Sequence, residues 1–250
     1  MEALKVEGLS KYFGGVQAVQ DVSFSVSIGE KLAIIGPNGA GKTTLFNLLN
    51  GQLSPTKGRI FLYGKNITNL QINQRAHLGM SRSFQITNLF GSLTAKQNCL
   101  LALHGIRFSS FQMFRSINSY KPLLKKAEAL LETVGLLEEK DELVGYMSHG
   151  EQRKLEIAIS LALEPRLLLL DEPSAGLAPS ESIAIMNIIR NQRKDITALI
   201  VDHDMELVFG VADRVLVLHY GQIIADGAPR AIQNNPRVKE IYMAPDKGMK

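Results

Sequence analysis

The chain lacks tryptophan, has a single cysteine and contains no long run of apolar residues. Cys99 alone allows no internal disulfide and no cluster of thiolate ligands, which agrees with a reducing compartment and with a core position for this side chain. No stretch approaches the roughly twenty apolar residues that span a bilayer, and residues 1–5 lack the pattern of a signal peptide. We therefore expect a soluble protein that stays inside the cell.

The sequence also lacks a strong excess of charge of either sign. The formal net charge is +4, and lysine and arginine are scattered, with Lys125 and Lys126 as the nearest thing to a cluster. There is no stripe of basic and aromatic residues, so we expect no nucleic-acid partner. The mild excess fits phosphate ligation, contact with anionic headgroups or an ordinary solvated surface. With 45% hydrophobic and 21% charged residues, the 250-residue chain is predicted to be globular.

A glycine-rich loop follows the apolar residues 32–35 and predicts a site for a nucleoside triphosphate. The spacing is that of a P-loop, in which backbone N–H groups wrap the phosphates, a lysine reaches the outer phosphates and a threonine ligates Mg²⁺. A helix that begins near Lys42 adds the positive end of its dipole. The predicted ATP-binding residues of this loop are Gly36, Pro37, Asn38, Gly39, Ala40, Gly41, Lys42, Thr43 and Thr44.

Two adjacent carboxylates end a second apolar run. Residues 167–170 are four leucines, followed by Asp171, Glu172 and Pro173. This is typical of a buried parallel strand that delivers acidic side chains to its C-terminal edge. The pattern resembles a Walker B motif, in which Asp171 would hold Mg²⁺ and Glu172 would orient and deprotonate the attacking water. The alternative is that these residues only form a turn after a strand.

Residues 147–153 read Met-Ser-His-Gly-Glu-Gln-Arg and distinguish the chain from other P-loop proteins. They resemble the Leu-Ser-Gly-Gly-Gln signature of ABC-type ATPases, with Ser148 and Gly150 retained and Glu151 in place of the glutamine. The resemblance implies that this segment binds the γ-phosphate of an ATP held by the P-loop of a partner subunit. Ser148 and Glu151 also have the spacing of a helix-capping box, and both interpretations can hold at once.

Three further positions fit the family pattern. The resemblance implies that Gln85 senses Mg²⁺ and the attacking water, and that His203 contacts the γ-phosphate and holds the catalytic carboxylate. Phe13 fits the aromatic residue that stacks on adenine, although the adjacent Tyr12 could serve. Ala178 stands where the family usually has an aspartate that crosses the dimer interface, so we expect weaker side-chain bonding between subunits.

The resemblance covers almost the whole chain and is closest to the ATP-binding subunits of branched-chain amino-acid importers. The narrower match is carried by residues 11–15, 82–85, 89–90, 152–158, 175–179 and 202–205. It implies an ATPase that uses ATP and Mg²⁺ and pairs head to tail with an identical or paralogous subunit. It further implies transmembrane permease subunits as partners, and hence a peripheral place on the inner face of the cell membrane. The implied catalytic residues are Glu172, His203 and Gln85, and the implied metal ligands are Thr43, Gln85 and Asp171.

The sequence motifs leave other functions open. None of these residues touches the cargo, so an exporter subunit or a urea or amide importer remains an alternative. A soluble P-loop kinase would explain the glycine-rich loop but not Ser148, Gly150 or His203. A non-transport ABC ATPase of DNA repair or translation usually has two cassettes in one chain or a long coiled coil, and this sequence has neither.

The expected fold is α/β, a P-loop ABC-type cassette with a mixed sheet core, an N-terminal antiparallel β-subdomain and a helical subdomain. In this single domain, residues 1–92 and 160–228 form the nucleotide-binding core with the antiparallel strands. Residues 93–159 form the helical subdomain, and 229–250 a C-terminal helix and tail. The alternation of apolar residues and serine over 22–28 predicts a half-buried antiparallel strand. Helices are predicted over 122–132, 179–190 and 205–211.

A transporter subunit must pass its motion to a membrane partner, and apolar residues after Gln85 are the candidates for that contact. They are Ile86, Leu89 and Phe90. The alternative is that these side chains pack internally against the helical subdomain, because isolated apolar residues are also common on surfaces.

Overall fold

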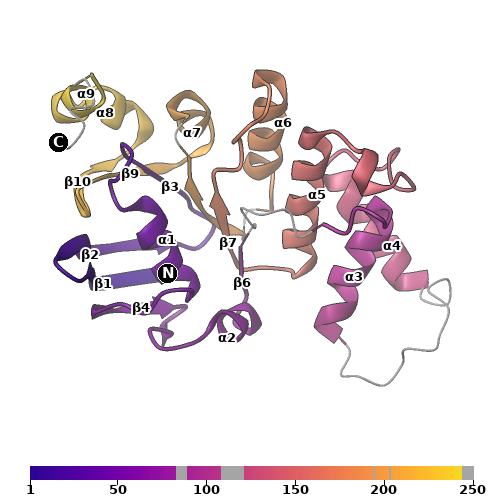
Figure 1. Cartoon of the computed structure of the whole chain (residues 1–250), viewed down its shortest axis with the longest axis horizontal. Coiled ribbons are helices and arrows are strands. Elements are labelled where there is room, and N and C mark those ends of the chain that lie inside the picture. The colour runs from indigo at the N-terminus through magenta and orange to yellow at the C-terminus, as the bar shows by residue number, and fades with distance from the viewer. Residues whose placement is uncertain (83–88, 108–120, 194, 203, 244–250) are drawn as a thin grey trace.

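Two β-sheets and the helices around them make up the part of the chain that the computed structural model describes, which is residues 1–250 without 83–88, 108–120, 194, 203 and 244–250. The sheets lie in one lobe, and α3, α4 and α5 form a second, helical lobe beside it (Figure 1).

The antiparallel sheet comes from residues 2–66. Its strands are β1 (Glu2–Phe13), β2 (Val16–Ser27), β4 (Lys57–Leu62) and β5 (Lys65–Asn66), in the order β2-β1-β4-β5. Val22, Phe24 and Val26 of β2 are buried, and the serines between and after them are exposed or half-buried. The predicted half-buried strand is therefore confirmed. It is longer than predicted because its antiparallel register with β1 continues back to Val16.

The second sheet is mostly parallel and follows the order β10-β9-β3-β8-β7-β6. Every neighbouring pair is parallel except β10 with β9. Because the carboxyl ends of parallel strands meet at one edge, the loops that follow β3, β6, β7 and β8 share that edge. The strands are β3 (Lys31–Ile35), β6 (Met80–Arg82), β7 (Leu167–Asp171), β8 (Thr197–Val201), β9 (Arg214–His219) and β10 (Gln222–Gly227).

The helices are α1 (Lys42–Asn50), α2 (Ile72–His77), α3 (Ala95–Arg107), α4 (Lys121–Thr133), α5 (His149–Ala162), α6 (Pro179–Arg190), α7 (Met205–Val211), α8 (Pro229–Gln233) and α9 (Pro236–Met243). The predicted bounds of α6 and α7 are confirmed. Over residues 229–243, the described part of the C-terminal segment, there are two short helices where a single one was expected. The second begins because the side chain of Asn235 accepts hydrogen bonds from the N–H groups of Arg237 and Val238, and Pro236 fits a first helical turn.

Alternate residues of the parallel strands enter different cores. Leu32 and Ile34 of β3 pack with α1 and the antiparallel sheet, so α1 lies between the two sheets. Ala33 and Ile35 face the opposite side, where they pack with α7, α8 and α9. This two-sided burial explains why the central strands are continuous apolar runs in the sequence.

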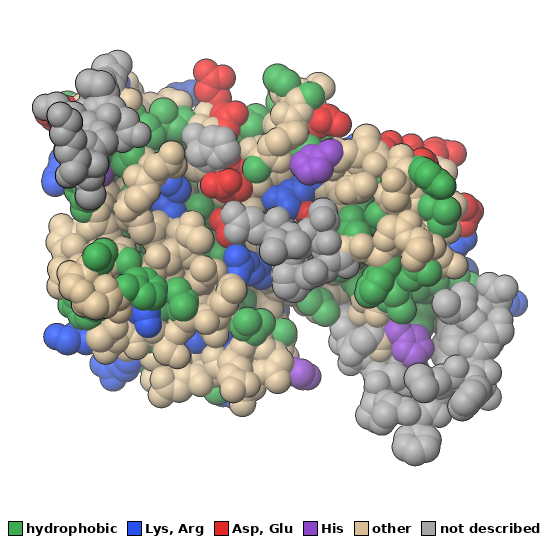
Figure 2. Space-filling view, viewed as in Figure 1, with side chains coloured by type: hydrophobic (Ala, Val, Ile, Leu, Met, Phe, Trp, Pro, Cys, Tyr) green, Lys and Arg blue, Asp and Glu red, His purple; other side chains and the backbone are tan. Residues whose placement is uncertain are grey.

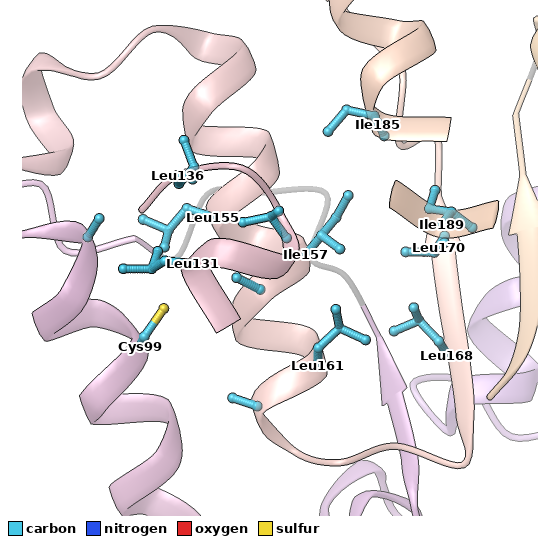
Figure 3. Packing of buried hydrophobic residues seen from close by; sticks show 14 of the residues in the cluster. Cys99, Leu131, Leu136, Leu155, Ile157, Leu161, Leu168, Leu170, Ile185 and Ile189 are labelled. Carbon is cyan, nitrogen blue, oxygen red and sulfur yellow. The ribbon is translucent and has the colours of Figure 1, made fainter. Parts of the chain in front are cut away.

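A third core connects the helical lobe to the sheet through α5. Figure 3 shows Leu155 of α5 directed toward Leu131 and Leu136, whereas Leu161 lies beside Leu168 of β7. Cys99 is buried in this cluster, as predicted, and burial raises its pKa to about 12. The helix α5 therefore contacts both the helical lobe and β7 of the sheet.

Candidate active site

The glycine-rich loop joins β3 to α1, and two of its glycines lie very close to the backbone of neighbouring strands. Gly41 has a left-handed backbone (φ 98°), and a Cβ there would lie 2.3 Å from the carbonyl oxygen of Ala18. A Cβ on Gly36 would lie 2.2 Å from the carbonyl oxygen of Leu218. Only glycine fits such approaches, so the loop is held against β2 and β9. As predicted, α1 begins at Lys42, and its first turn has no acidic residue that would neutralise the positive end of the dipole.

A cleft of about 570 Å³ opens above this loop. Its lining combines residues of the loop and of α1 with one carboxylate, that of Glu172. The chain therefore brings together two motifs that lie about 130 positions apart in the sequence. The lining residues are Val16, Gln17, Ala18, Gln20, Asn38, Gly39, Ala40, Gly41, Lys42, Thr43, Thr44, Glu172 and Tyr220.

Lys42 lies in the cleft with its ammonium turned onto the loop. Its Nζ donates hydrogen bonds to the carbonyl oxygens of Gly36 at 2.6 Å and of Pro37 at 3.0 Å. Burial lowers the pKa of Lys42, and the negative charges of Glu172 and Asp171 oppose that shift. The arrangement holds a cation in a partly desolvated cleft, which favours an anionic ligand.

The aromatic residues near the cleft differ in part from the expectation. Phe13 is 47% exposed at the end of β1 and pairs in register with Val16, a lining residue, but it is not itself part of the lining. Tyr220, at the turn between β9 and β10, lines the cleft and is 66% exposed. No pattern in the sequence indicates Tyr220, because this residue comes next to the cleft only through the pairing of β9 with β3.

Asp171 ends β7 and is almost fully buried, with 1% of its surface exposed. Its carboxylate accepts a hydrogen bond at 3.1 Å from Arg82, the last residue of β6. Burial raises the pKa of Asp171, and the Arg82 guanidinium opposes this shift. Arg82 also donates to Asn47 and Gln52 and lies over the ring of Phe46. No pattern in the sequence indicates this arginine, because the parallel pairing of two distant strands brings the two charges together.

Glu172 has a left-handed backbone (φ 45°), which residues with a side chain rarely adopt. Its N–H donates to the carbonyl oxygen of Val201 at 2.6 Å, so β8 fixes this turn from one side. Arg153 of α5 fixes it from the other side, through bonds to the carbonyl oxygens of residues 171–173. The turn thus places Glu172 in the lining of the cleft.

The two predicted residues Gln85 and His203 lie outside the described part of the chain. Their described neighbours are at the edge of the sheet. Arg82 ends β6, and Asp202 follows β8 and accepts a hydrogen bond from the hydroxyl of Ser174 at 2.6 Å. This bond connects the segment after Glu172 to the segment that leads into position 203.

Ser148, Gly150 and Glu151 stand at the start of α5 and do not line the cleft. Ser148 caps the helix, and its N–H and hydroxyl both donate to Glu151, so the capping-box interpretation is confirmed. Gly150 packs closely on α6, where a Cβ would lie 2.2 Å from a carboxylate oxygen of Glu181. Ala178, at the position of the missing aspartate, caps α6 without a side-chain bond.

The oxygen donors at this edge fit Mg²⁺ held together with nucleotide phosphates. The Thr43 hydroxyl and the Asp171 carboxylate are the hard ligands that this ion prefers. Across the described residues, no group of three or more histidine, cysteine, aspartate or glutamate side chains could hold a metal by itself.

Replacing Arg82 with Met is expected to lower the free energy of unfolding by about 3 kcal/mol near neutral pH, because a buried carboxylate loses its counter-ion. The folded-state pKa of Asp171 would then rise further above its unfolded value. The loss should therefore shrink as pH falls through that raised pKa, since the protonated carboxyl needs no cation. Urea unfolding of nucleotide-free and metal-free protein at about pH 7 and about pH 5 measures both effects.

The Asp171→Asn background is the control for that experiment. There, Arg82→Met should cost less and should show little dependence on pH, because the ion pair is already absent. Only the hydrogen bonds to Asn47 and Gln52 and the packing on Phe46 are then lost. An equal loss at both pH values in the single variant would contradict the role of Arg82 as counter-ion.

A second cavity, a groove of about 290 Å³, lies on the helical lobe. Its lining is mainly apolar, and Figure 2 shows hydrophobic side chains gathered on this part of the molecule. Of the three contact candidates, Ile86 lies outside the described residues, Phe90 is 58% exposed, and Leu89 packs partly buried against the core of the lobe. The lining residues are Leu89, Phe90, Asn98, Leu101, Ala102, Glu156, Ile159 and Ser160.

Two families match the sequence. The family described as "ABC transporter" matches residues 19–175, and the one described as "Branched-chain amino acid ATP-binding cassette transporter" matches residues 222–243. Among solved structures, a nucleotide-free ATP-binding cassette of an ABC transporter has a TM-score of 0.84 at 32% identity. The ADP conformation of another cassette has a TM-score of 0.86 at 33% identity. Each comparison covers 98% of this chain and 100% of the other chain.

Three named proteins are similar over nearly their full length. The chain is 38% identical to the high-affinity branched-chain amino acid transport ATP-binding protein LivG of Escherichia coli strain K12. It is 39% identical to the corresponding protein BraF of Pseudomonas aeruginosa. Both comparisons cover 96% of this chain and 97% of the relative. It is 35% identical to the lipopolysaccharide export system ATP-binding protein LptB of Acidithiobacillus ferridurans, over 97% of each chain. No helix in the described ranges is long and apolar enough to cross a membrane.

Proposed function

The chain belongs to the ABC transporter family of ATPases, and on that premise we propose that it powers the import of branched-chain amino acids through a membrane permease. The observation that carries the proposal is one cleft in which Lys42 and Thr43 of the loop face the carboxylate of Glu172. The cargo is supported by the names of LivG and BraF and by the match over residues 222–243.

In this proposal, different residues bind the triphosphate, hold the metal ion and activate the attacking water. Backbone N–H groups of 36–44 and the ammonium of Lys42 bind the triphosphate. Mg²⁺, held by Thr43, Asp171 and Gln85, would supply charge neutralisation on the phosphates. Glu172 takes the proton of the attacking water, and His203 holds this carboxylate and the γ-phosphate in place. Phe13 or Tyr12 would stack on the adenine, at the end of the β1–β2 hairpin.

A second copy of the ATPase, identical or paralogous, would complete the site. Ser148 and Gly150 lie outside the cleft of their own chain, at the start of α5. We therefore place them against the nucleotide of a partner subunit in a head-to-tail pair, with Glu151 retained as the capping partner of Ser148. Hydrolysis would remove the phosphate that bridges the two subunits, and they would separate.

We propose that the permease binds at the groove on the helical lobe. Phe90 and Leu101 expose apolar surface at its rim, with 58% and 44% of their areas accessible. Two large exposed apolar residues beside one cavity are unusual for a free surface and are typical of a contact site. Through this contact the subunit would sit on the inner face of the cell membrane.

Phe90→Ala is expected to weaken binding of the detergent-solubilised permease about thirtyfold, the effect of losing one central aromatic anchor. The matched control is Ile72→Ala, which removes a comparably exposed apolar side chain (51%) from α2. Titration of immobilised permease with each variant measures the affinity. Wild-type affinity of Phe90→Ala would place the permease elsewhere.

The cargo is tested by reconstituting the complete transporter in vesicles and following uptake of labelled leucine, isoleucine and valine. ATP-dependent accumulation that requires Glu172 would support import. ATP hydrolysis without accumulation of any of these three amino acids would show that they are not the cargo. Extrusion of a lipid would instead support the function named for the export relative LptB.

A further inference from the structure

Arg153 lies buried on α5 and donates to three consecutive main-chain carbonyl groups. Its Nε donates to the oxygen of Pro173 at 3.0 Å, and its Nη2 donates to those of Asp171 at 3.1 Å and Glu172 at 2.6 Å. These carbonyls belong to the turn that follows β7. A planar guanidinium satisfies several acceptors in one fixed geometry, so it fixes the direction of the turn more closely than a single bond would.

This turn requires such support because Glu172 has a left-handed backbone (φ 45°). A residue with a side chain holds that conformation only when its surroundings impose it. The N–H of Glu172 is fixed by Val201 of β8. The carbonyl side of the turn is fixed by Arg153. The helix that carries Arg153 thus controls one of the two constraints on the position of the Glu172 carboxylate.

The same guanidinium is connected to the groove on the helical lobe. Its Nη1 donates to Glu156 Oε2 at 2.6 Å, and both side chains are nearly buried, 10% and 6% exposed. Glu156 lines the groove beside Phe90 and Ser160. Among the described residues, its second carboxylate oxygen, Oε1, is buried without a hydrogen-bond partner. A buried acceptor without a partner is costly, and it is best relieved by a donor that enters the groove.

We propose that Arg153 is a positioning residue for Glu172, and that Glu156 makes this positioning depend on the occupant of the groove. This inference rests on the proposed function. The occupant is an apolar segment of the permease that presents one N–H or O–H donor to Glu156 Oε1. A mainly apolar lining that includes one unpartnered acceptor favours that chemistry over an acidic or purely apolar segment.

The mechanism needs no large motion. A donor that binds Glu156 competes with Arg153 for the carboxylate and weakens their ion pair. The guanidinium then moves relative to the carbonyl groups of residues 171–173. Displacement of a catalytic group by even about 1 Å changes rates by orders of magnitude. Since α5 begins at Ser148, the proposed contact with the partner subunit would act on the same helix.

The first test compares Arg153→Met with Arg153→Lys, with Lys154→Met as a control on the same helix. Arg153→Met is expected to lower kcat about ten- to hundredfold while the Kd for ATP changes less than about twofold. Arg153→Lys should recover part of the loss, because an ammonium reaches some of the carbonyls but cannot reproduce the fork. Lys154→Met should behave as wild type. A purely structural role would lower the active fraction and leave kcat per folded molecule unchanged, so each rate is normalised to the ATP-binding fraction.

The second test concerns the groove and uses the complex with the permease. Glu156→Gln is expected to lower the permease-stimulated rate at least about fivefold more than the basal rate. Equal reductions of both rates would overturn the link to the groove, and wild-type kcat in folded Arg153→Met would overturn the positioning role. If Arg153→Met does not fold, Arg153→Gln, which retains donors, carries the same test. Absence of ATP hydrolysis by the wild-type protein would instead contradict the proposed function.

Discussion

Glu172→Gln is expected to reduce ATP turnover about a thousandfold while ATP binding is retained. Glutamine has nearly the same shape as glutamate but is neutral and cannot accept the proton of the attacking water. The left-handed turn is set by main-chain bonds to Val201 and Arg153, which the substitution does not touch. The chemical step should therefore fail without a change in the fold. Single-turnover hydrolysis of labelled ATP, together with equilibrium ATP binding, separates the two effects.

The same variant should accumulate a dimer in the presence of ATP, visible by size-exclusion chromatography. The bridging γ-phosphate would persist between Lys42 of one subunit and Ser148 of the partner subunit. Glu206→Gln is the matched control, because it makes the same chemical change on an exposed residue in the first turn of α7. Wild-type turnover in Glu172→Gln would remove this residue from the role of general base, and a monomer with bound ATP would contradict the head-to-tail pair.

The parts of the fold that could be predicted are those encoded in short, contiguous patterns. The loop over 36–44 is one such case, because its glycines and lysine act through backbone geometry that a few neighbouring residues determine. The bounds of α6 and α7 are another, since Pro179 and Asp204 mark helix starts locally. The capping box of Ser148 and Glu151 is equally local.

The residues that could not be predicted act across the fold. Arg82 meets Asp171 only because β6 and β7 pair in parallel, and Tyr220 reaches the cleft only through the pairing of β9. Arg153 is one more charged residue on a helix in the sequence, and its three carbonyl partners follow from the packing of α5 on the turn after β7. Long-range contacts of single side chains leave no periodic signal.

The contact candidates after position 85 show the same distinction. The sequence left two alternatives for them, exposure or internal packing. Phe90 is exposed at the groove, whereas Leu89 is partly buried in the lobe. One of these adjacent apolar residues is therefore exposed and the other packs internally. Which side chain faces outward depends on how the segment enters α3, and hydrophobicity alone does not encode that.

Lys42→Ala is expected to weaken ATP binding by about a hundredfold. The Lys42 ammonium is hydrogen-bonded to the carbonyls of Gly36 and Pro37 in the structure and is partly desolvated. Moving onto the outer phosphates, it would exchange neutral acceptors for charged ones, and the gain of one strong charge-assisted bond is roughly 3 kcal/mol. Loss of that bond corresponds to the expected factor. Titration with a fluorescent ATP analogue measures the change.

The control for Lys42→Ala is AMP, whose single phosphate does not occupy the outer positions. The affinity for AMP should change much less than that for ATP, because the lysine acts on the phosphates that AMP lacks. Unfolding in urea shows whether the alanine variant retains its fold, since the bonds to Gly36 and Pro37 are also lost. Equal weakening of both nucleotides would mean that the substitution distorts the loop as a whole. Unchanged ATP affinity in a folded variant would show that this ammonium stays on the loop carbonyls and does not reach the triphosphate.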